Sequence, residues 1–374
     1  MSALREKIEQ EIGEHGPIPF SRYMELCLYD PEHGYYSRNA EQFGKAGDFY
    51  TSSDVHALFG RLLARQFDEM WQVLGCPDHI MLRELGPGRG LFAQDVLDWS
   101  EKKFPDFYGA LRYLLEERSP ALRQRIEVTL SRHLKSGKAV LQSSGDLSAP
   151  NIVFANEFFD ALPVEVVSSE GSLRIGSPNG RLVETWAPTS PSELEFLDRY
   201  SIHPEPGERV EVPLQSQAYM SAAAKIERGF VIAIDYGYTR EEQLAGRYRG
   251  TLKAIRQHSV SDNPYEAPGE QDITAEVNFT ALAAAAGKQG MQAQKVITQS
   301  KFLLGIGEGT EFADAFADCR LRQERAKVAL QLKHLVTPAG MGESFQVLIT
   351  SKRVEKEKAS SLAGLSFARN TRVR

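Results

Sequence analysis

The 374-residue sequence has little cysteine and no cluster of metal-binding side chains. Its three cysteines, Cys27, Cys76 and Cys319, stand far apart, which excludes a disulfide framework and the paired cysteine spacing of a zinc site. The eight histidines are scattered and no HExxH pattern occurs, so we predict no metal centre. A reducing compartment follows as the default environment.

Long apolar runs and an excess of positive charge are missing as well. No stretch approaches the ~18 apolar residues of a membrane span. Lysine and arginine total 44 against 50 acidic residues, a net charge of −6 that argues against binding nucleic acid by bulk charge. The first residues lack the apolar core of a secretion signal, and Glu6, Glu9, Glu11 and Glu14 are unlike an acid-poor transit peptide. We therefore expect a cytoplasmic, bacterial-type protein.

What the sequence does contain is an alternation of apolar strand segments and amphipathic helices. This alternation is typical of an α/β fold in which a parallel, doubly wound, Rossmann-like sheet carries helices on both faces. The GESFQVLITSKR segment near the end predicts a last strand. The earlier strands are expected at residues 79–85, 113–117, 139–142, 151–155 and 230–235.

The chain is longer than a minimal doubly wound sheet requires. Asn179-Gly180 between two alternating segments is a strong hairpin signal within the extra length. We expect an N-terminal helical and lid segment (1–76), a core (77–238) with a hairpin insertion at about 168–228, an added, mainly helical substrate subdomain with a late strand (239–335), a final core strand (336–352) and a basic flexible tail (353–374).

The ELGPGRG segment at 84–90 follows an expected strand and opens an expected helix. Glycine permits a tight turn and close approach to a ligand, and the helix N-terminus presents free N–H groups. The G-x-G-x-G spacing differs from the dinucleotide fingerprint, and Glu84 would repel a pyrophosphate, which favours S-adenosylmethionine. We predict that Glu84, Gly86, Gly88 and Gly90 bind this cofactor, with a purely structural glycine turn as the alternative.

Two further strand ends supply candidate cofactor residues. A carboxylate at the end of the second strand can accept the ribose hydroxyls, and Glu117 is preferred over Glu116. After the third strand, Asp146 is positioned to meet the adenine amino group, with Leu147 beside it. Because the carboxyl ends of parallel strands share one edge, these residues are expected near the glycine turn.

The NEFFD segment at 156–160 directly follows the fourth strand, where the reactive end of the cofactor is expected. The Asn156 amide oxygen can accept an N–H of the methyl acceptor, and Phe159 can lie against a planar group or a cation. Glu157 and Asp160 can orient a guanidinium, which presents five N–H donors. We predict that Asn156, Glu157 and Asp160 are catalytic. Alternatively, the rings belong to the core and the acids cap a helix.

Together these segments resemble the MidA-like family of S-adenosylmethionine-dependent methyltransferases. The glycine turn is common to many methyltransferases, whereas NEFFDALP, DYGY and QDIT in combination are much more specific. The resemblance spans nearly the whole chain and is carried by YDPEHGYY (29–36), GDFYTS (47–52), ELGPGRG (84–90), RSP (118–120), NEFFDALPVE (156–165), DYGY (235–238), GTL (250–252), PGEQDITAEVNFTAL (268–282), TQSKFLLGIG and MGESFQVL.

The resemblance implies a class I methyltransferase fold, S-adenosylmethionine as cofactor and an arginine of a protein as methyl acceptor. The family includes the mitochondrial complex I assembly factor that dimethylates an arginine of a complex I subunit. The implied partner is therefore a protein with an exposed arginine, such as a respiratory-complex subunit. In the family, a histidine and an aspartate commonly stand where this chain has Glu276 and Asn278.

Several residues complete the expected site. Asp235, Tyr236 and Asp272 follow a strand or lie in a loop that is expected to face the same crevice, so they are substrate-site candidates. Aromatic residues of the N-terminal segment are candidates for a lid that closes over the cofactor and excludes water. They are Tyr36, Phe49 and Tyr50.

Three alternatives to protein-arginine methylation stay open on the sequence. The added segments and basic tail fit a non-enzymatic assembly or scaffold protein that keeps a cofactor-binding fold. Asparagine followed by aromatics also fits a nucleic-acid amino methyltransferase, although the acidic net charge argues against it. A nicotinamide-dependent dehydrogenase is the weakest alternative, because the glycine spacing does not match its fingerprint.

Overall fold

The computed structural model describes residues 2–37, 57–142, 149–256, 259–261, 263–338 and 340–369. Two compact units make up the chain. The parallel unit contains Thr51–Glu157, Ala223–Tyr236 and Ala286–Arg374, and the antiparallel unit contains Met1–Tyr50, Phe158–Ala222 and Gly237–Ala285. Because the chain passes repeatedly from one unit to the other, the units cut across the continuous segments expected from the sequence.

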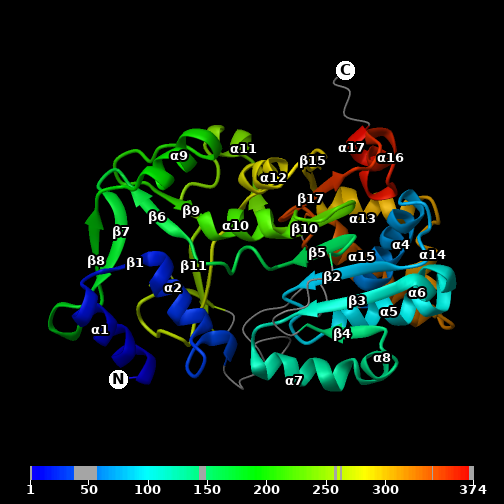
Figure 1. The fold of residues 1–374 in the computed structure, drawn as a ribbon, viewed down its shortest axis with the longest axis horizontal. Coiled ribbons are helices and arrows are strands. Elements are labelled where there is room, and N and C mark those ends of the chain that lie inside the picture. The colour runs from blue at the N-terminus through cyan, green and yellow to red at the C-terminus, as the bar shows by residue number, and fades with distance from the viewer. Residues whose placement is uncertain are drawn as a thin grey trace. The chain divides into compact units, whose positions relative to one another are not determined.

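The parallel unit is built on one large sheet (Figure 1). Neighbouring strands from β4 to β10 are parallel, and β17 pairs antiparallel with β10. This arrangement confirms the predicted α/β, doubly wound fold. In spatial order the strands are β15 (Gln292–Ala293), β17 (Phe345–Lys352), β10 (Gly229–Tyr238), β5 (Ile152–Asn156), β2 (Ile80–Leu85), β3 (Leu111–Glu116) and β4 (Ala139–Leu141), with β16 (Ile297–Thr298) beside β17.

Continuous apolar sequence explains why β5 and β10 are central strands. Residues Ile152–Ala155 are all buried, as are Phe230–Ile234, and such runs are typical of strands that are covered on both faces. Helices α4 (Leu58–Val73) and α5 (Leu91–Lys103) pack on β5 through aromatic rings. The rings of Phe92 and Phe154 stack at 4.6 Å, and Phe67 meets Phe154 edge-on at 5.6 Å.

The remaining helices of the parallel unit follow the expected pattern. Ser119 caps α7 by accepting a hydrogen bond from the Leu122 N–H, as its position before Pro120 predicts. The region 313–336 contains two of these helices with a break between them. These helices are α6 (Pro105–Ala110), α7 (Pro120–Thr129), α8 (Ser131–Lys135), α13 (Gln299–Glu308), α14 (Ala313–Phe316) and α15 (Arg322–Val336).

The segment expected to be a flexible basic tail contains regular structure over residues 356–369. It forms α16 (Lys356–Ser360), η3 (Ala363–Leu365) and α17 (Ser366–Arg369). Ala359, Leu362 and Leu365 are buried in the main core, and the Gly364 N–H donates to the Gln66 side chain at 2.9 Å. The expectation of a flexible tail is wrong there, because these apolar residues recur every three positions among many charges.

The antiparallel unit contains a second sheet, in which β7 lies between β6 and β8. The Asn179-Gly180 turn joins β7 to β8, which confirms the predicted hairpin. Asn179 and Gly180 both have positive φ, 55° and 70°. The strands are β1 (Ile18–Pro19), β6 (Glu165–Ser168), β7 (Gly171–Gly176), β8 (Val183–Ala187) and β9 (Arg209–Val212), with η2 (Pro178–Gly180) as the turn.

The first residues of the chain form part of the core of this unit. Leu4 and Ile8 of α1 are buried in one cluster with Leu173 and Ile175 of β7. Residues 2–37 therefore belong to the folded body of the antiparallel unit. Its helices are α1 (Ala3–His15), α2 (Phe20–Tyr29), η1 (Tyr35–Ser37), α9 (Pro191–Tyr200), α10 (Leu214–Ala223), α11 (Arg240–Leu244) and α12 (Phe279–Lys288).

The region after residue 239 is less helical than expected. Strands β11 (Lys253–Arg256), β12 (Ser259–Ser261) and β13 (Asp272–Thr274) form a small antiparallel sheet, and β14 (Val277–Asn278) pairs with the end of β10. The expectation of a mainly helical subdomain fails here because these strands are too short to show a period of two. In the described part of the chain, no helix is both long and apolar enough to cross a membrane.

Candidate active site

The parallel strands bring the predicted cofactor segments to one edge of their sheet. Leu85 of β2 pairs with Glu116 of β3 on one side and with Ala155 of β5 on the other. The segments that follow these three strands therefore start at the same level. The strand order reverses between β2 and β5, which is where open α/β sheets bind their ligands.

The glycine turn after β2 adopts a backbone that requires glycine. Gly86, Gly88 and Gly90 have φ of 64°, 55° and 76°, in the left-handed region that side chains disfavour. The Gly86 N–H donates to the Glu116 carbonyl at 3.0 Å, which ties the turn to β3. A Cβ on Gly88 would meet no atom within 4 Å, so the turn faces open space there. Helix α5 then begins at Leu91.

Glu84, the penultimate residue of β2, is a buried acid with a tyrosine partner. The Tyr113 hydroxyl donates to Glu84 Oε2 at 2.9 Å. Burial raises the pKa of Glu84 to about 8, the Glu117 charge adds to this rise, and the Tyr113 hydrogen bond opposes it. The carboxyl is therefore largely neutral at pH 7. A cation bound beside it would restore the negative charge.

Glu117, which follows β3, is hydrogen-bonded to the glycine turn. Its carboxylate accepts from the Ser119 N–H at 2.8 Å and from the backbone of Gly88 and Arg118. Burial raises its pKa, and these backbone hydrogen bonds act in the opposite direction. Glu116, the second choice for the ribose, is the last residue of β3 and supplies the carbonyl that holds Gly86.

Asn156 and Glu157 form a pair where β5 ends. Asn156 Nδ2 donates to Glu157 Oε1 at 3.0 Å, and the Glu157 N–H donates to the Ile234 carbonyl at 3.0 Å. Glu157 has a φ of 50°, a strained conformation for a side chain of its type and one that is concentrated at functional sites. Asn156 Oδ1 is buried and has no hydrogen-bond partner among the described residues. It is an acceptor that a ligand N–H would satisfy.

Asp235 and Tyr236 lie within β10 and not after it. The strand continues to Tyr238, four residues beyond the apolar run Phe230–Ile234. Asp235 is fully buried, and its carboxylate accepts the Tyr236 N–H at 2.9 Å. The ring centroids of Tyr236 and Phe345 are 3.9 Å apart. Tyr236 is thus supported by the antiparallel partner strand β17.

The other predicted substrate-site residues belong to the antiparallel unit. The Tyr36 hydroxyl donates to Asp272 Oδ1 at 2.9 Å, and the Tyr36 ring stacks on Tyr29 at 5.6 Å. Burial raises the pKa of Asp160 to about 6, and the Glu276 charge contributes to the rise. Within this unit Tyr36, Asp160, Asp272 and Glu276 thus combine aromatic surface with carboxylates.

Phe159 is also in the antiparallel unit and is 2% exposed. It meets Phe158 edge-on, with ring centroids 5.3 Å apart, and Phe158 in turn meets Tyr219 at 5.4 Å. Of the two adjacent rings, Phe158 retains more accessible surface. Asp146, Leu147, Phe49 and Tyr50 lie outside the described residues.

Two residues that contact or influence the predicted site residues, Tyr113 and Glu276, were not predicted as site residues from the sequence. Tyr113 could not be linked to Glu84 because their contact depends on how β2 and β3 align. Glu276 was noted only as a departure from the family pattern, although its charge affects Asp160. In the described part of the chain, no group of three or more His, Cys, Asp and Glu residues is arranged to hold a metal ion.

The residues that the structure brings together fit S-adenosylmethionine. The glycine turn faces open space at Gly88, Glu117 is tied to that turn, and Asn156 offers an unsatisfied acceptor at the end of the neighbouring strand. Glu84 is suited to a cationic amino group because its buried carboxyl gains a counter-charge from it. A pyrophosphate would place negative charge beside two acidic side chains, Glu84 and Glu117, and would oppose the ionisation of both.

The fold and this edge of the sheet define a methyltransferase, and comparison with known proteins agrees. Residues 62–297 match the model of a family of S-adenosyl-L-methionine-dependent methyltransferases. The chain belongs to this family, and its cofactor is S-adenosylmethionine. The match covers the glycine turn, the NEFFD segment and the last substrate-site candidate, Asp272.

The chain is similar to animal proteins over most of its length. The mitochondrial protein arginine methyltransferase NDUFAF7 of Danio rerio is 30% identical over 92% of this chain and 86% of its own. The Drosophila melanogaster homologue is 29% identical over 92% and 84%. A Burkholderia thailandensis protein that was crystallised with S-adenosyl-homocysteine has a TM-score of 0.80 at 28% identity, and the match covers 96% of this chain and 94% of that protein.

These relatives contradict the prediction of a cytoplasmic, bacterial-type protein. The fly, zebrafish and human proteins are all named as mitochondrial. The prediction is wrong because it inferred the subcellular localisation from the composition of the first residues. Those residues form α1, whose Leu4 and Ile8 belong to the core and whose acids are exposed or half-buried, so their composition reflects a packed helix.

Proposed function

We propose that this methyltransferase transfers methyl groups to arginine of a protein acceptor. The observation that carries the proposal is the pair at the end of β5, where Asn156 Oδ1 is an unsatisfied buried acceptor and Glu157 lies 3.0 Å from the amide nitrogen. An arginine guanidinium supplies the N–H donors that such a pair accepts. The names of the zebrafish and fly relatives give independent support.

The proposed chemistry assigns separate tasks to three side chains. S-adenosylmethionine supplies an electrophilic methyl group on its sulfonium. Glu157 and Asp160 orient the guanidinium and concentrate its positive charge away from the attacking nitrogen. Asn156 Oδ1 accepts an N–H of the attacking nitrogen and aligns it for in-line displacement, so that positioning supplies much of the rate.

The remaining residues are proposed to hold the two ligands. Glu84, Gly86, Gly88 and Gly90 contact the methionine part of the cofactor, Glu117 the ribose, and Asp146 with Leu147 the adenine. On the acceptor side we place Phe159, Asp235, Tyr236 and Asp272. The acceptor protein carries an exposed arginine, and a respiratory-complex subunit is the candidate.

Mass spectrometry of arginine methylation tests this function directly. Proteomes with and without the gene are compared, and purified protein is then incubated with labelled cofactor and the lysate of the deletion strain. We expect one discrete protein to carry label on arginine. Label that accumulates in lipid, in nucleic acid or on another amino acid would contradict the proposal.

The variant Glu157→Gln tests the proposed catalytic role of Glu157. It keeps the shape of the side chain but removes the charge that orients the guanidinium, so methyl transfer should fall by about 10²-fold or more. Glu170→Gln removes an exposed charge on the turn between β6 and β7 and serves as the matched control. Equal activity of both variants would exclude a catalytic role for Glu157.

A further inference from the structure

The hairpin turn of the antiparallel unit is attached to helix α1 by an arginine. Arg5 Nη2 donates to the Gly180 carbonyl at 2.9 Å, and Arg5 Nε donates to Glu9 at 3.0 Å. These contacts fix the Arg5 guanidinium and the turn that precedes Arg181. The two arginines are therefore placed together by elements that are far apart in the sequence.

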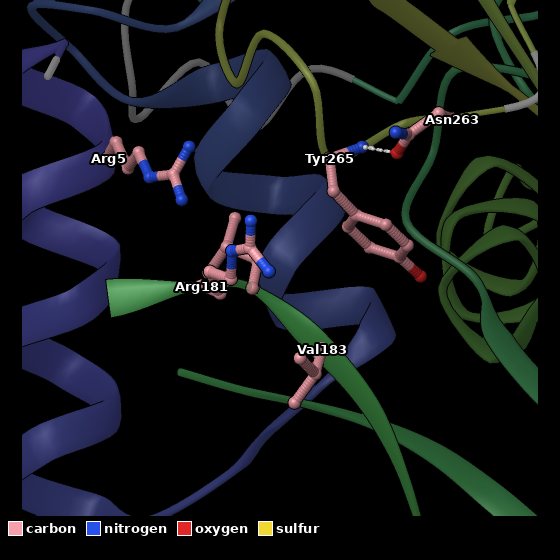
Figure 2. Close-up of a pocket in the computed structure, with 6 residues that line it drawn as sticks. Arg5, Arg181, Val183, Asn263 and Tyr265 are labelled. Atoms are coloured by element: carbon pink, nitrogen blue, oxygen red, sulfur yellow. Dashed lines mark hydrogen bonds between the residues drawn. The ribbon is translucent and has the colours of Figure 1, made fainter. Parts of the chain in front are cut away.

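A surface cavity of about 380 Å³ lies at this junction. Arg5 and Arg181 both extend into it, with Val183 and Tyr265 at its wall (Figure 2). It is lined by Arg5, Arg181, Leu182, Val183, Asn263 and Tyr265. Arg181 and Asn263 are exposed, so the cavity is open to solvent.

The charges around the cavity do not balance. Glu9 neutralises Arg5, while Glu184 is occupied by a bidentate pair with Arg209, at 2.8 and 2.5 Å, and by the Tyr265 hydroxyl at 2.8 Å. Arg181 makes no ion pair with any described residue. The cavity thus has a net positive charge in a protein whose overall charge is negative.

The other side of the cavity is apolar and rigid. Leu182 and Val183 supply aliphatic surface, and the Tyr265 ring packs on Tyr23 at 5.3 Å. The Tyr265 N–H donates to Asn263 Oδ1 at 3.0 Å, which fixes the loop that carries the ring (Figure 2). A fitting ligand combines a carboxylate with a neighbouring aliphatic group.

The cavity also opens beside a sheet edge. Val183 is the first residue of β8, and among the described strands β8 pairs with β7 alone. An extended polypeptide can add to such an edge through its backbone while its side chains enter adjacent pockets. This neighbourhood favours a peptide over a small anion.

We propose that this cavity binds an acidic, aliphatic segment of the acceptor protein. A glutamate or aspartate of that segment lies between the guanidiniums of Arg5 and Arg181, and the next outward side chain packs on Leu182 and Val183. The identity of the ligand as part of the acceptor rests on the proposed function. The contact is separate from the methylated arginine, so it contributes acceptor affinity and not the chemical step.

Fluorescence anisotropy with the full chain measures this binding. The probe is a fluorescein-labelled octapeptide of alternating glutamate and leucine, compared with its glutamine-leucine counterpart. Arg181→Glu should weaken binding of the acidic probe by about 10-fold, since it replaces an attraction by a repulsion. Arg199→Glu on α9 makes the same change of charge at an exposed i,i+4 pair and should alter binding less than about 2-fold.

Three results would overturn the site. The first is an equal loss of affinity in Arg181→Glu and Arg199→Glu, which would indicate a general charge effect. The second is equal binding of the glutamine-leucine probe, and the third is displacement of the probe by acetate at concentrations where the peptide is half bound. The last result would assign the cavity to small carboxylates.

Acceptor kinetics keep this proposal distinct from the proposed function. With the identified acceptor, Arg181→Glu should raise KM about 5-fold or more at unchanged kcat. Arginine methylation with an unaltered KM in this variant would refute the docking site alone. Peptide binding that depends on Arg181 without any arginine methylation would refute the proposed function alone.

Discussion

The buried environment of Glu84 makes the stability of the folded protein depend on pH through the protonation of this side chain. Its pKa is about 8 in the folded protein, above the value of about 4.5 for an exposed glutamate. The folded state therefore holds the proton more tightly. Stability from this group is fully present below about pH 4.5 and is lost as the pH rises through about 8.

Glu84→Gln should accordingly become the more stable protein at high pH. Glutamine keeps an oxygen that can accept from Tyr113 but has no proton to lose. Between pH 5.5 and pH 9, we expect the free energy of unfolding of the wild type to fall by about 2–4 kcal/mol relative to that of the variant. Urea unfolding at both pH values measures this, and a pH-independent difference would refute the raised pKa.

Asp160 should impose an acidic limb on the activity. Its pKa of about 6 means that the carboxylate that we propose to orient the guanidinium forms as the pH rises through 6. In the wild type, kcat/KM should rise across this range, and Asp160→Asn should lower it about 10- to 100-fold and flatten the limb.

The control for this measurement is Asp106→Asn, an exposed aspartate in the first turn of α6. It should keep the wild-type profile. An acidic limb that persists in Asp160→Asn would assign the titration to another group.

At the scale of single elements, the glycine turn has the most direct functional consequence. Gly88 has a φ of 55° and faces open space, so alanine there meets no neighbouring atom but takes up space in which we propose that the cofactor binds. Gly88→Ala should lower affinity for S-adenosylhomocysteine at least about 10-fold, with a loss of stability of about 1–2 kcal/mol.

Gly109→Ala in α6 is the matched control. This glycine is helical, and an added Cβ would also meet nothing within 4 Å. Alanine should stabilise α6 slightly and leave ligand binding unchanged. Calorimetric titration of both variants measures the contrast, and an equal affinity would show that the cofactor does not approach Gly88.

The same elements show what local sequence can predict. The positive φ values of ELGPGRG and of the Asn-Gly hairpin follow from residue type, and the long apolar runs of β5 and β10 mark buried strands without further information. Pairing between distant segments carries no such signal. The Tyr113–Glu84 contact depends on the alignment of β2 with β3, and the β11–β13 sheet depends on partners some 20 residues apart.

The end of the chain was mispredicted for a different reason. A count of charges over 353–374 outweighed Ala359, Leu362 and Leu365, whose burial decides the structure of this segment. At the carboxyl edge of the sheet, the placement of Glu84, Glu117 and Asn156 at the ends of three neighbouring strands was predictable, whereas the hydrogen bonds between Glu117 and the glycine turn were not.

For the whole molecule, the order of strands makes the C-terminal region indispensable. Strand β17 pairs with β10 over eight residues and lies between β10 and β15. A chain that stops after residue 340 should lose cooperative unfolding and accumulate in the insoluble fraction. A chain that stops after residue 369 should unfold like the full-length protein, as judged by circular dichroism during heating.

Cooperative unfolding of the shorter chain would mean that the parallel unit does not need β17. The chain that stops after residue 340 lacks both β17 and the segment that contains Ala359, Leu362 and Leu365, whereas the chain that stops after residue 369 keeps both. Loss of stability in the first chain without loss in the second is the expected pattern.

The interleaving of the two units also affects how the protein is made. A ribosome that has just completed β10 must add about 100 residues before it completes the strand that pairs with it on one side. At typical synthesis rates this takes roughly 5–20 s. During that time the apolar residues Phe230–Ile234 of β10 pair only with β5, so protection by a chaperone would matter most while the intervening residues are being synthesised.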